Sequence, residues 1–276
     1  APHYDEARRM LGATNNPRET LADELLREVA VELDREAHFS SNPVAVYFGT
    51  PNETVPDPYF GGDGPERTGC LHCGACMTGC RHGAKNTLDK NYLYLAEKLG
   101  VEVLANTEVV RVQPRGEGGF QIQCRESRGW FRRKPVQIEA DQVVFSGGVL
   151  GTVDLLLRMK KDQEALPELS ERLGHGIRTN SESLIGVVSP KRDIDFTQGG
   201  AITSILHTDE HSHVEPVRYG SGSGFWRLMS LPHAPGDNRA VRLWNACRGF
   251  FRRPLRWLRV LCVWNYAKHS LVLLYM

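Results

Sequence analysis

Long apolar runs are absent from this sequence of 276 residues, and their absence excludes several classes of protein. No stretch of about 18 apolar residues occurs, so no transmembrane helix is expected. The first residues, APHYDEARRM, lack both an initiator methionine and the apolar core of a signal peptide. The formal net charge is only +1, which implies no polyelectrolyte partner. We therefore predict a cytoplasmic or peripherally membrane-bound protein.

The two ends of the sequence also lack the marks of a natural boundary. The last residues, SLVLLYM, stop within an apolar run that is typical of a strand. Apolar residues make up 41% and charged residues 24% of the chain, an ordinary balance for a soluble protein. The length suits one large domain or two interleaved ones. We expect the chain to be an internal piece of a longer protein.

Cysteine is scarce except in one short run. Four of the seven cysteines, Cys70, Cys73, Cys76 and Cys80, fall within eleven residues. The spacing C-x2-C-x2-C-x3-C can collect four thiolates around an iron–sulfur cluster or a zinc ion. The fit is imperfect, because Arg81 stands where ferredoxins carry a proline and no second run exists. Four semi-buried thiols, or one or two disulfides, in a glycine-rich loop are an equally good interpretation.

Apolar periodicity divides the chain into helical and strand-like segments. Helices are expected over residues 17–34, after Thr87, after residues 146–151, and between Pro167 and Gly174. The first of these carries Leu21, Leu25, Val29 and Leu33 on one face. Strands are expected over 101–112, in a meander over 117–140, and over 141–145, 183–190, 199–207, 213–220 and 226–232. This order predicts an α/β protein, with part of a doubly wound nucleotide-binding domain interleaved with a sheet-based substrate domain.

A glycine turn follows the strand expected over 141–145. It consists of Ser146, Gly147, Gly148, Val149, Leu150 and Gly151, close to G-x-G-x-x-G but with serine in the first position. Glycines between a strand and a helix let backbone N–H groups approach an anionic ligand. Tight packing of the helix on the strand explains such glycines about as often.

Two histidines and a glutamate alternate in the run His211–Ser212–His213–Val214–Glu215. Alternation places them on one face of a strand, where they would bind a metal or Glu215 would act as a general base. No distal third ligand is evident, so a polar, solvated strand face is favoured over a metal site. The sequence pattern alone neither favours nor opposes a role of Glu215 as a general base.

The segment 242–268 contains seven basic residues and no acidic one. Tryptophan, phenylalanine and leucine are interleaved with the arginines. Such a segment is typical of peripheral contact with an anionic membrane, although a helix docked by its apolar face explains it as well. No nucleic-acid-binding module accompanies it, so no nucleic-acid partner is expected.

Several runs together resemble one family. They are HGAKNTLDKNYLYLAEKLGVEVLANTEVVRV, DQVVFSGGVLGTVDLLLRMK, LPELSERLGHGIRTNSES and HVEPVRYGSG. In this order they resemble the glucose–methanol–choline (GMC) oxidoreductases, and in particular the cholesterol oxidase branch. The resemblance implies FAD-dependent oxidation of a sterol or another bulky hydrophobic alcohol to a ketone or aldehyde. It leaves open whether oxygen or another acceptor reoxidises the flavin.

The resemblance also implies roles for individual residues. The strand with Val109 would pass the adenine, and the turn with Ser146, Gly147, Gly148 and Gly151 would pack beside the dinucleotide. Asn180 would lie where the chain enters the substrate domain near the flavin. Glu215 matches the family's catalytic glutamate, which takes part in proton transfer during double-bond isomerisation, although Pro216 departs from the pattern.

Two departures from the family accompany these matches. The N-terminal G-x-G-x-x-G that anchors the FAD pyrophosphate is absent, and so is the C-terminal segment with the active-site histidine and asparagine. We therefore expect this chain alone to be inactive. By resemblance, residues 1–80 are part of a substrate or cap domain and contain the cysteine loop, 81–176 are part of the FAD-binding domain, and 177–276 are part of the substrate-binding domain.

Two other functions stay open. One is an iron–sulfur or zinc protein that uses the run from Cys70 to Cys80 without flavin. The other is a non-catalytic remnant of a broken gene.

Overall fold

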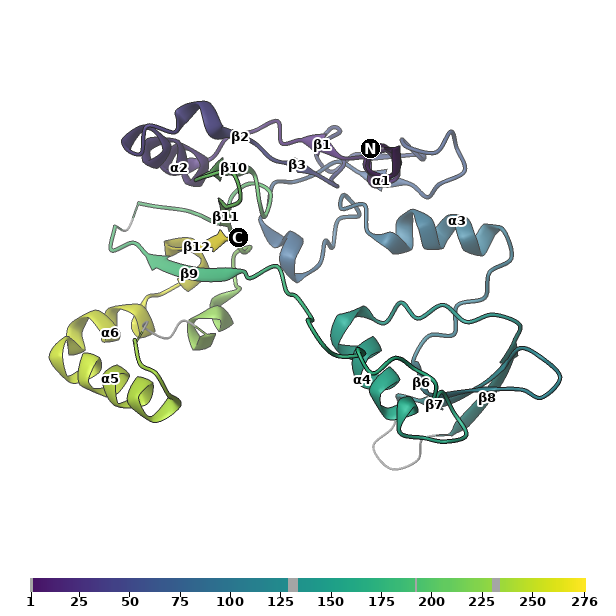
Figure 1. Ribbon diagram of the computed structural model, residues 1–276. Helices are drawn as coiled ribbons and strands as arrows, with labels where there is room; N and C mark the ends of the chain where they lie inside the picture. The colour runs from purple at the N-terminus through teal and green to yellow at the C-terminus, as the bar shows by residue number, and fades with distance from the viewer. Residues whose placement is uncertain (1, 129–133, 192, 230–233) are drawn as a thin grey trace. The chain divides into compact units, whose positions relative to one another are not determined.

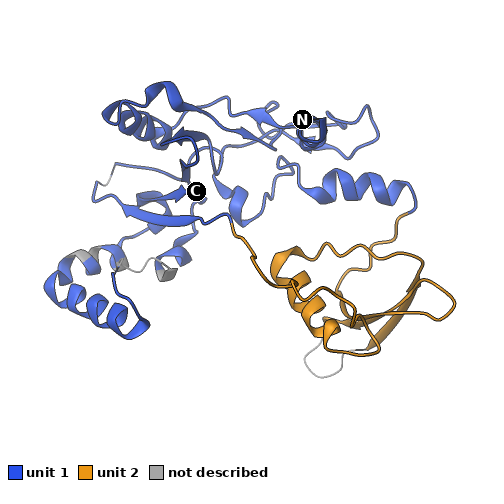
Figure 2. Ribbon diagram, in the orientation of Figure 1, with its two compact units in different colours: residues 1–100, 180–276 blue, residues 101–179 orange. Residues whose placement is uncertain are grey.

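The computed structural model describes residues 2–128, 134–191, 193–229 and 234–276 (Figure 1). The chain forms two compact units, residues 1–100 with 180–276 and residues 101–179 (Figure 2). Both units combine helices with sheets, which confirms the mixed α/β class. The assignment of 1–80, 81–176 and 177–276 to functional domains stays a prediction.

The first unit is built around an antiparallel sheet with the strand order β2-β10-β11-β12-β9. These strands are β2 (Phe39–Ser41), β9 (Ser183–Val188), β10 (Ser204–His207), β11 (His213–Val217) and β12 (Ser270–Tyr275). Short strands form two further pairs, β1 (Thr14–Asn15) with β3 (Pro43–Val44) and β4 (Thr54–Val55) with β5 (Arg67–Thr68). Its α-helices are α1 (Pro2–Leu11), α2 (Leu21–Glu32), α3 (Tyr92–Lys98), α5 (Arg239–Arg252), α6 (Pro254–Cys262) and α7 (Tyr266–His269). Its 3-10 helices are η1 (Glu36–His38), η2 (Ala75–Thr78), η3 (Leu88–Lys90) and η4 (Gly224–Met229).

Helix α2 covers one face of this sheet. Thr20 caps the helix, and its backbone N–H donates to Asp23 Oδ2 at 2.8 Å. Leu26 and Ala30 pack against Leu206 of β10. The buried stripe is therefore shifted by one residue from the predicted one. Two residues of the predicted stripe are largely exposed, Val29 at 43% and Leu33 at 54%. The small side chains of Ala22 and Ala30 let the helix lie close to the sheet. Packing against the sheet, and not the apolar pattern of the helix, therefore decides which face is buried.

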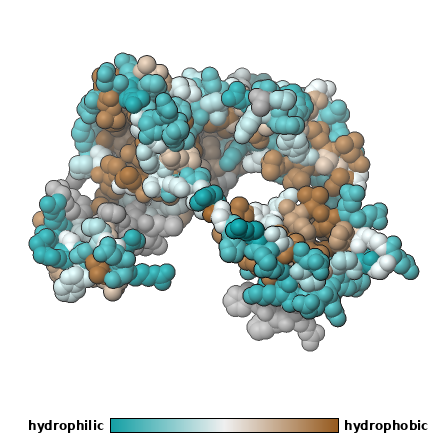
Figure 3. Space-filling model, in the orientation of Figure 1, coloured by the Kyte–Doolittle hydropathy of each residue, from teal (hydrophilic) through white to brown (hydrophobic). Residues whose placement is uncertain are grey.

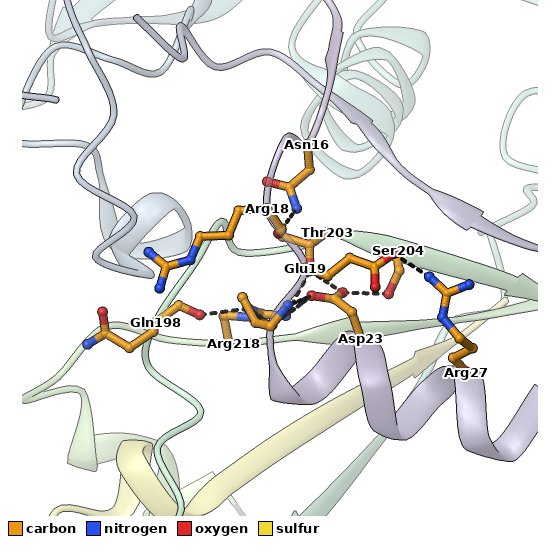
Figure 4. A network of polar contacts seen from close by, with 10 residues as sticks. Asn16, Arg18, Glu19, Asp23, Arg27, Gln198, Thr203, Ser204 and Arg218 are labelled. Carbon is orange, nitrogen blue, oxygen red and sulfur yellow. Dashed lines mark hydrogen bonds and ion pairs between the residues drawn. The ribbon is translucent and has the colours of Figure 1, made fainter. Parts of the chain in front are cut away.

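A buried ion pair joins α2 to the strand region that follows β11 (Figure 4). Asp23 and Arg218 have side chains only 1% exposed, with 3.5 Å between Asp23 Oδ2 and Arg218 Nη2. Asp23 Oδ1 also accepts hydrogen bonds from the hydroxyls of Thr203 and, at 2.6 Å, Ser204. Burial opposes ionisation of Asp23, but the hydrogen bonds and the charge of Arg218 outweigh it and lower its pKa.

The second unit consists of a three-stranded antiparallel sheet and one helix. Its elements are β6 (Thr107–Pro114), β7 (Phe120–Glu126), β8 (Pro135–Ala140) and α4 (Gly148–Lys160). Val112, Ile122 and Cys124 of the sheet pack with Met159 of α4 in one core. The predicted meander and the helix after the glycine turn are confirmed, apart from residues 129–133, which lie outside the described residues.

Three predicted elements are wrong, and a fourth begins later than expected. Residues 141–145 form no strand, and no strand of the described chain pairs with them. The stretch from Pro167 to Gly174 forms turns instead of a helix, and residues 226–229 lie in η4 instead of a strand, with 230–232 outside the described residues. The helix expected after Thr87 begins at Tyr92, because the Asn91 side chain accepts from the Tyr92 N–H and η3 precedes it.

None of the helices among the described residues is long and apolar enough to cross a membrane.

Candidate functional site

Glu215 lies on the face of the five-stranded sheet that is opposite α2. Its neighbour Val214 packs with the α2 cluster, so the alternation of β11 turns Glu215 to the other side. The register pairs Glu215 with Leu274 of β12 and pairs His213 with His207 of β10. Two histidines therefore lie on the same face as the carboxyl group, and their rings are 5.6 Å apart.

The surroundings of Glu215 favour its protonated form. The residue is only 7% exposed, and burial raises the pKa of its carboxyl group, although His213 and Asn42 oppose the shift. Asn42 Nδ2 donates to Glu215 Oε1 at 2.8 Å, and His213 Nε2 is 3.9 Å from the same oxygen. A raised pKa brings the titration of a carboxyl group closer to neutral pH, which suits a general base.

The metal interpretation of the histidine run gains no support from this geometry. His211 is exposed in the turn before β11, whereas His213 and Glu215 lie within the strand. Across the described ranges, no three His, Cys, Asp or Glu side chains are grouped as a metal ion requires.

The glycine turn opens helix α4 in the second unit. Ser146, Gly147, Gly148 and Gly151 are exposed, and Gly148 has a left-handed φ of +74° with open space where a Cβ would lie. No side chain caps the first turn of α4, and no acidic residue occupies it. Its backbone N–H groups are thus accessible to an anionic group.

Apolar side chains in or next to this turn in the sequence, and one on β6 of the same unit, are exposed. Val144 is 85% and Leu150 is 86% exposed, and Val109 on β6 is 36% exposed. Figure 3 shows further hydrophobic residues on the surfaces of both units. Apolar side chains at this density favour contact with a ligand or with other parts of a protein.

Asn180 belongs to the first unit, whereas the other residues predicted to bind the cofactor belong to the second. Its amide donates to Glu182 and, at 3.8 Å, to the sulfur of Met276. The structure gives Asn180 a local role beside β9, and its predicted role near flavin stays a prediction.

The cysteine run forms a loop that is closed at its base by a buried arginine. Arg67 is fully buried and donates at 2.7 Å to Asn86 Oδ1 and to the Lys90 carbonyl. Residues 67 and 86 thus join the two ends of the loop. At its tip, Gly199 N donates to the His72 carbonyl at 2.7 Å, and Gly74 N donates to the Gly199 carbonyl at 2.9 Å.

All four cysteines of the loop line one small cavity, together with His82 and Lys85. Its volume of about 10 Å³ is close to the room that one water molecule needs. Among the described residues, no three His, Cys, Asp or Glu side chains are grouped as a metal ion requires. The structure therefore gives no support to the iron–sulfur or zinc site, which stays a prediction.

We expect Gly74→Ala to lower the free energy of unfolding by about 2–3 kcal/mol. Gly74 has a φ of +68°, and a Cβ there would lie 2.3 Å from the Thr197 carbonyl oxygen. Gly61 has the same φ of +68° with nothing within 4 Å, so Gly61→Ala should cost only about 1 kcal/mol. Urea unfolding of both variants measures the difference, and equal losses would show that the loop is not held against Thr197.

The basic segment 242–268 folds into α5, α6 and α7. Exposed apolar residues of this segment include Leu243 at 67%, Trp244 at 70% and Trp264 at 92%. The observed helices and exposures are compatible with the predicted membrane contact, which stays a prediction.

Two partners of the candidate site were missed in the sequence. Asn42 is 173 residues from Glu215, and His207 lies in another strand. The motif around Glu215 gives no signal for either, because only the register of the sheet brings them together.

Comparison with known proteins gives consistent matches. Residues 65–173 match the sequence profile of the family described as GMC oxidoreductase. The chain is 49% identical over 243 residues to a protein named cholesterol oxidase from Mycobacterium tuberculosis (strain H37Rv), covering 86% of this chain and 42% of that protein. It is 39% identical over 283 residues to a cholesterol oxidase from Acinetobacter baumannii, covering 99% of this chain and 51% of that protein. The chain thus spans about half the length of the curated relatives it matches.

Proposed function

The chain belongs to the GMC oxidoreductase family, and from this we propose that its protein oxidises a sterol or another bulky hydrophobic alcohol with FAD. The observation that carries the proposal is the 39–49% identity, along most of the chain, to proteins named cholesterol oxidase. The family match itself spans the cysteine loop, the meander and the glycine turn, but ends before Glu215.

FAD would supply the redox chemistry by accepting the hydride from the carbinol carbon. The exposed turn of Ser146, Gly147, Gly148 and Gly151 fits such a group, because its N–H groups are uncapped and no Cβ blocks Gly148. Val109 would offer apolar contact from β6 of the same unit. Each of these residues therefore serves binding and orientation in the proposal.

Glu215 would handle a proton at substrate carbon. Some sterols carry a double bond that begins at the second carbon from the carbinol carbon. Oxidation of that carbinol gives a β,γ-unsaturated ketone. The carbon between the carbonyl and the double bond is then acidic, and a carboxylate beside it can take that proton and return it at the γ carbon. Asn42 would hold the carboxylate in place through its bond to Oε1.

The test is flavin content and sterol turnover in a protein that carries this sequence at the length of its relatives. We expect yellow protein with bound FAD and ketone formation from a 3-hydroxysterol, and little turnover of ethanol. Gly148→Val should lose flavin, because a branched side chain would cover the approach to the first turn of α4.

The matched control is Gly118→Val in the same unit. Gly118 has a left-handed φ of +98° and, like Gly148, nothing within 4 Å of the position that a Cβ would take, but it lies in the hairpin loop between β6 and β7. Retention of flavin by Gly148→Val would contradict the proposed binding turn. Flavin-loaded protein that turns over ethanol but no sterol would contradict the proposed substrate class.

A further inference from the structure

Helices α5 and α6 form a hairpin that leaves its apolar side chains uncovered by the described chain (Figure 1). Arg253 joins the two helices, and Pro254 opens α6, where its fixed φ suits a first helical turn. The rings of Phe250 and Trp257 hold the helices together, with 5.6 Å between their centroids. All 14 residues of α5 are described, and none of them is buried. A helix docked by its apolar face against the chain therefore finds no support in α5.

The exposed apolar side chains of the hairpin share one face of each helix. On α5, Trp244 is 70% and Phe251 is 78% exposed, and their spacing of seven residues places them on the same side. On α6, Leu255 is 73% and Leu258 is 47% exposed, at a spacing of three residues. Trp264 follows α6 and is 92% exposed. Large apolar side chains gathered in this way favour contact with an apolar phase.

The charge of the same segment has one sign. Residues 238–276 contain no aspartate or glutamate but eight basic side chains, Arg239, Arg242, Arg248, Arg252, Arg253, Arg256, Arg259 and Lys268. Arg248 and Arg252 are exposed and follow Trp244 by four and eight residues, so they flank the apolar face of α5. The whole chain has a net charge of only +1, so the positive charge is concentrated here. An anionic lipid surface complements both properties, because negative headgroups adjoin an apolar phase.

We propose that the α5–α6 hairpin binds the surface of an anionic phospholipid bilayer. Its apolar face, with Trp244, Phe251 and Leu255, enters the boundary between the headgroups and the acyl chains. Arg248 and Arg252 stay at the level of the lipid phosphates, where each contributes about fivefold to the partition constant. This contact does not depend on the proposed oxidation, because the hairpin includes none of the residues assigned to flavin binding or proton transfer.

The experiment measures co-sedimentation with sterol-free vesicles of a protein that carries this sequence at the length of its relatives. At that length, the segments able to cover the hairpin within the protein are present. Vesicles of phosphatidylcholine and phosphatidylglycerol in equal parts are compared with vesicles of phosphatidylcholine alone. We expect a partition constant at least about tenfold higher for the anionic vesicles, and a fall of this constant as added salt screens the charges. Without sterol, the result is independent of substrate turnover.

The double variant Trp244→Ser with Arg248→Gln tests whether the hairpin is the binding surface. It should lower the partition constant for anionic vesicles about fiftyfold, with about tenfold from the lost apolar side chain and about fivefold from the lost charge. Tyr4→Ser with Arg8→Gln is the matched control, because it also removes an exposed aromatic ring and an exposed arginine four residues apart, on α1. The control should leave binding unchanged. Circular dichroism of both variants checks that they fold.

Three results would overturn the proposal. The first is equal partition of the unaltered protein onto the two kinds of vesicle, or partition onto neither, which needs no variant to fold. The second is the same loss of binding in the double variant and in its control. The third is a dimer in gel filtration that Trp244→Ser dissociates and that keeps the unaltered protein off the vesicles, since a second copy would then cover this face.

Discussion

Asp23→Ala is expected to lower the free energy of unfolding of the chain by about 3–5 kcal/mol, because it leaves the buried guanidinium of Arg218 without its carboxylate. Both side chains are 1% exposed, so water does not replace the lost partner. The change also removes the acceptor for Thr203, Ser204 and the capping Thr20. Urea unfolding followed by circular dichroism measures the loss.

Glu24→Ala is the control for this prediction. Glu24 is the next residue of α2 and is exposed. Its replacement by alanine removes a carboxylate from the same helical turn but leaves the ion pair of Arg218 with Asp23 in place. Its effect should stay within about 0.5 kcal/mol. Similar losses of unfolding free energy in the two variants would contradict the prediction. They would mean that the ion pair with Arg218 contributes no more than any carboxylate in the first turn of α2.

The lowered pKa of Asp23 also gives the pair a pH dependence. A carboxyl group whose folded pKa is depressed contributes stability above its unfolded value, and this contribution is lost as pH falls through the folded value. The loss should therefore begin near pH 4, the ordinary value for aspartate, and continue below it. Asp23→Ala should show a shallower fall in stability over this range than the unaltered chain.

The features that the sequence predicts well are those set by neighbours in the chain. The meander over 117–140 follows from alternating residues and the turn that joins β6 to β7, and the helix after Gly148 follows from its apolar spacing. The four cysteines also line one cavity, because they are neighbours within a short loop.

The features that the sequence misses depend on distant partners. Asp23 and Arg218 are 195 residues apart, and nothing in the helix pattern marks Asp23 as a buried ion. The same limit applies to residues 141–145, whose apolar composition resembles a strand but which find no strand to pair with in the described chain. At the candidate site, the motif identifies Glu215, whereas burial and Asn42 emerge only from the sheet.

Glu215→Gln is expected to slow double-bond isomerisation by about 10²–10⁴-fold in FAD-loaded protein of full length, the usual contribution of a general base. The amide keeps the size and the hydrogen-bonding capacity of the side chain but cannot take a proton at neutral pH. If Glu215 serves only this step, the β,γ-unsaturated ketone should accumulate. Product analysis by ultraviolet absorbance separates the conjugated from the unconjugated ketone.

The folding stability of Glu215→Gln serves as a control for its expected loss of isomerisation rate. Because the folded pKa of Glu215 is raised, its carboxyl group costs stability when ionised, and this cost grows as pH rises through the folded value. Glu215→Gln should therefore be at least as stable as the unaltered protein at alkaline pH. Loss of isomerisation together with loss of folding would point to a structural role instead.

Two further variants distinguish proton transfer from general disturbance. Glu210→Gln alters an exposed carboxylate in the turn before β11 and should leave the rate unchanged. Asn42→Ala removes the donor that opposes the raised pKa of Glu215, so the acidic limb of the pH–rate profile should move to higher pH. A uniform loss of rate without a shifted profile would contradict the role of Asn42, and an unchanged isomerisation rate in Glu215→Gln would contradict the role of Glu215 itself.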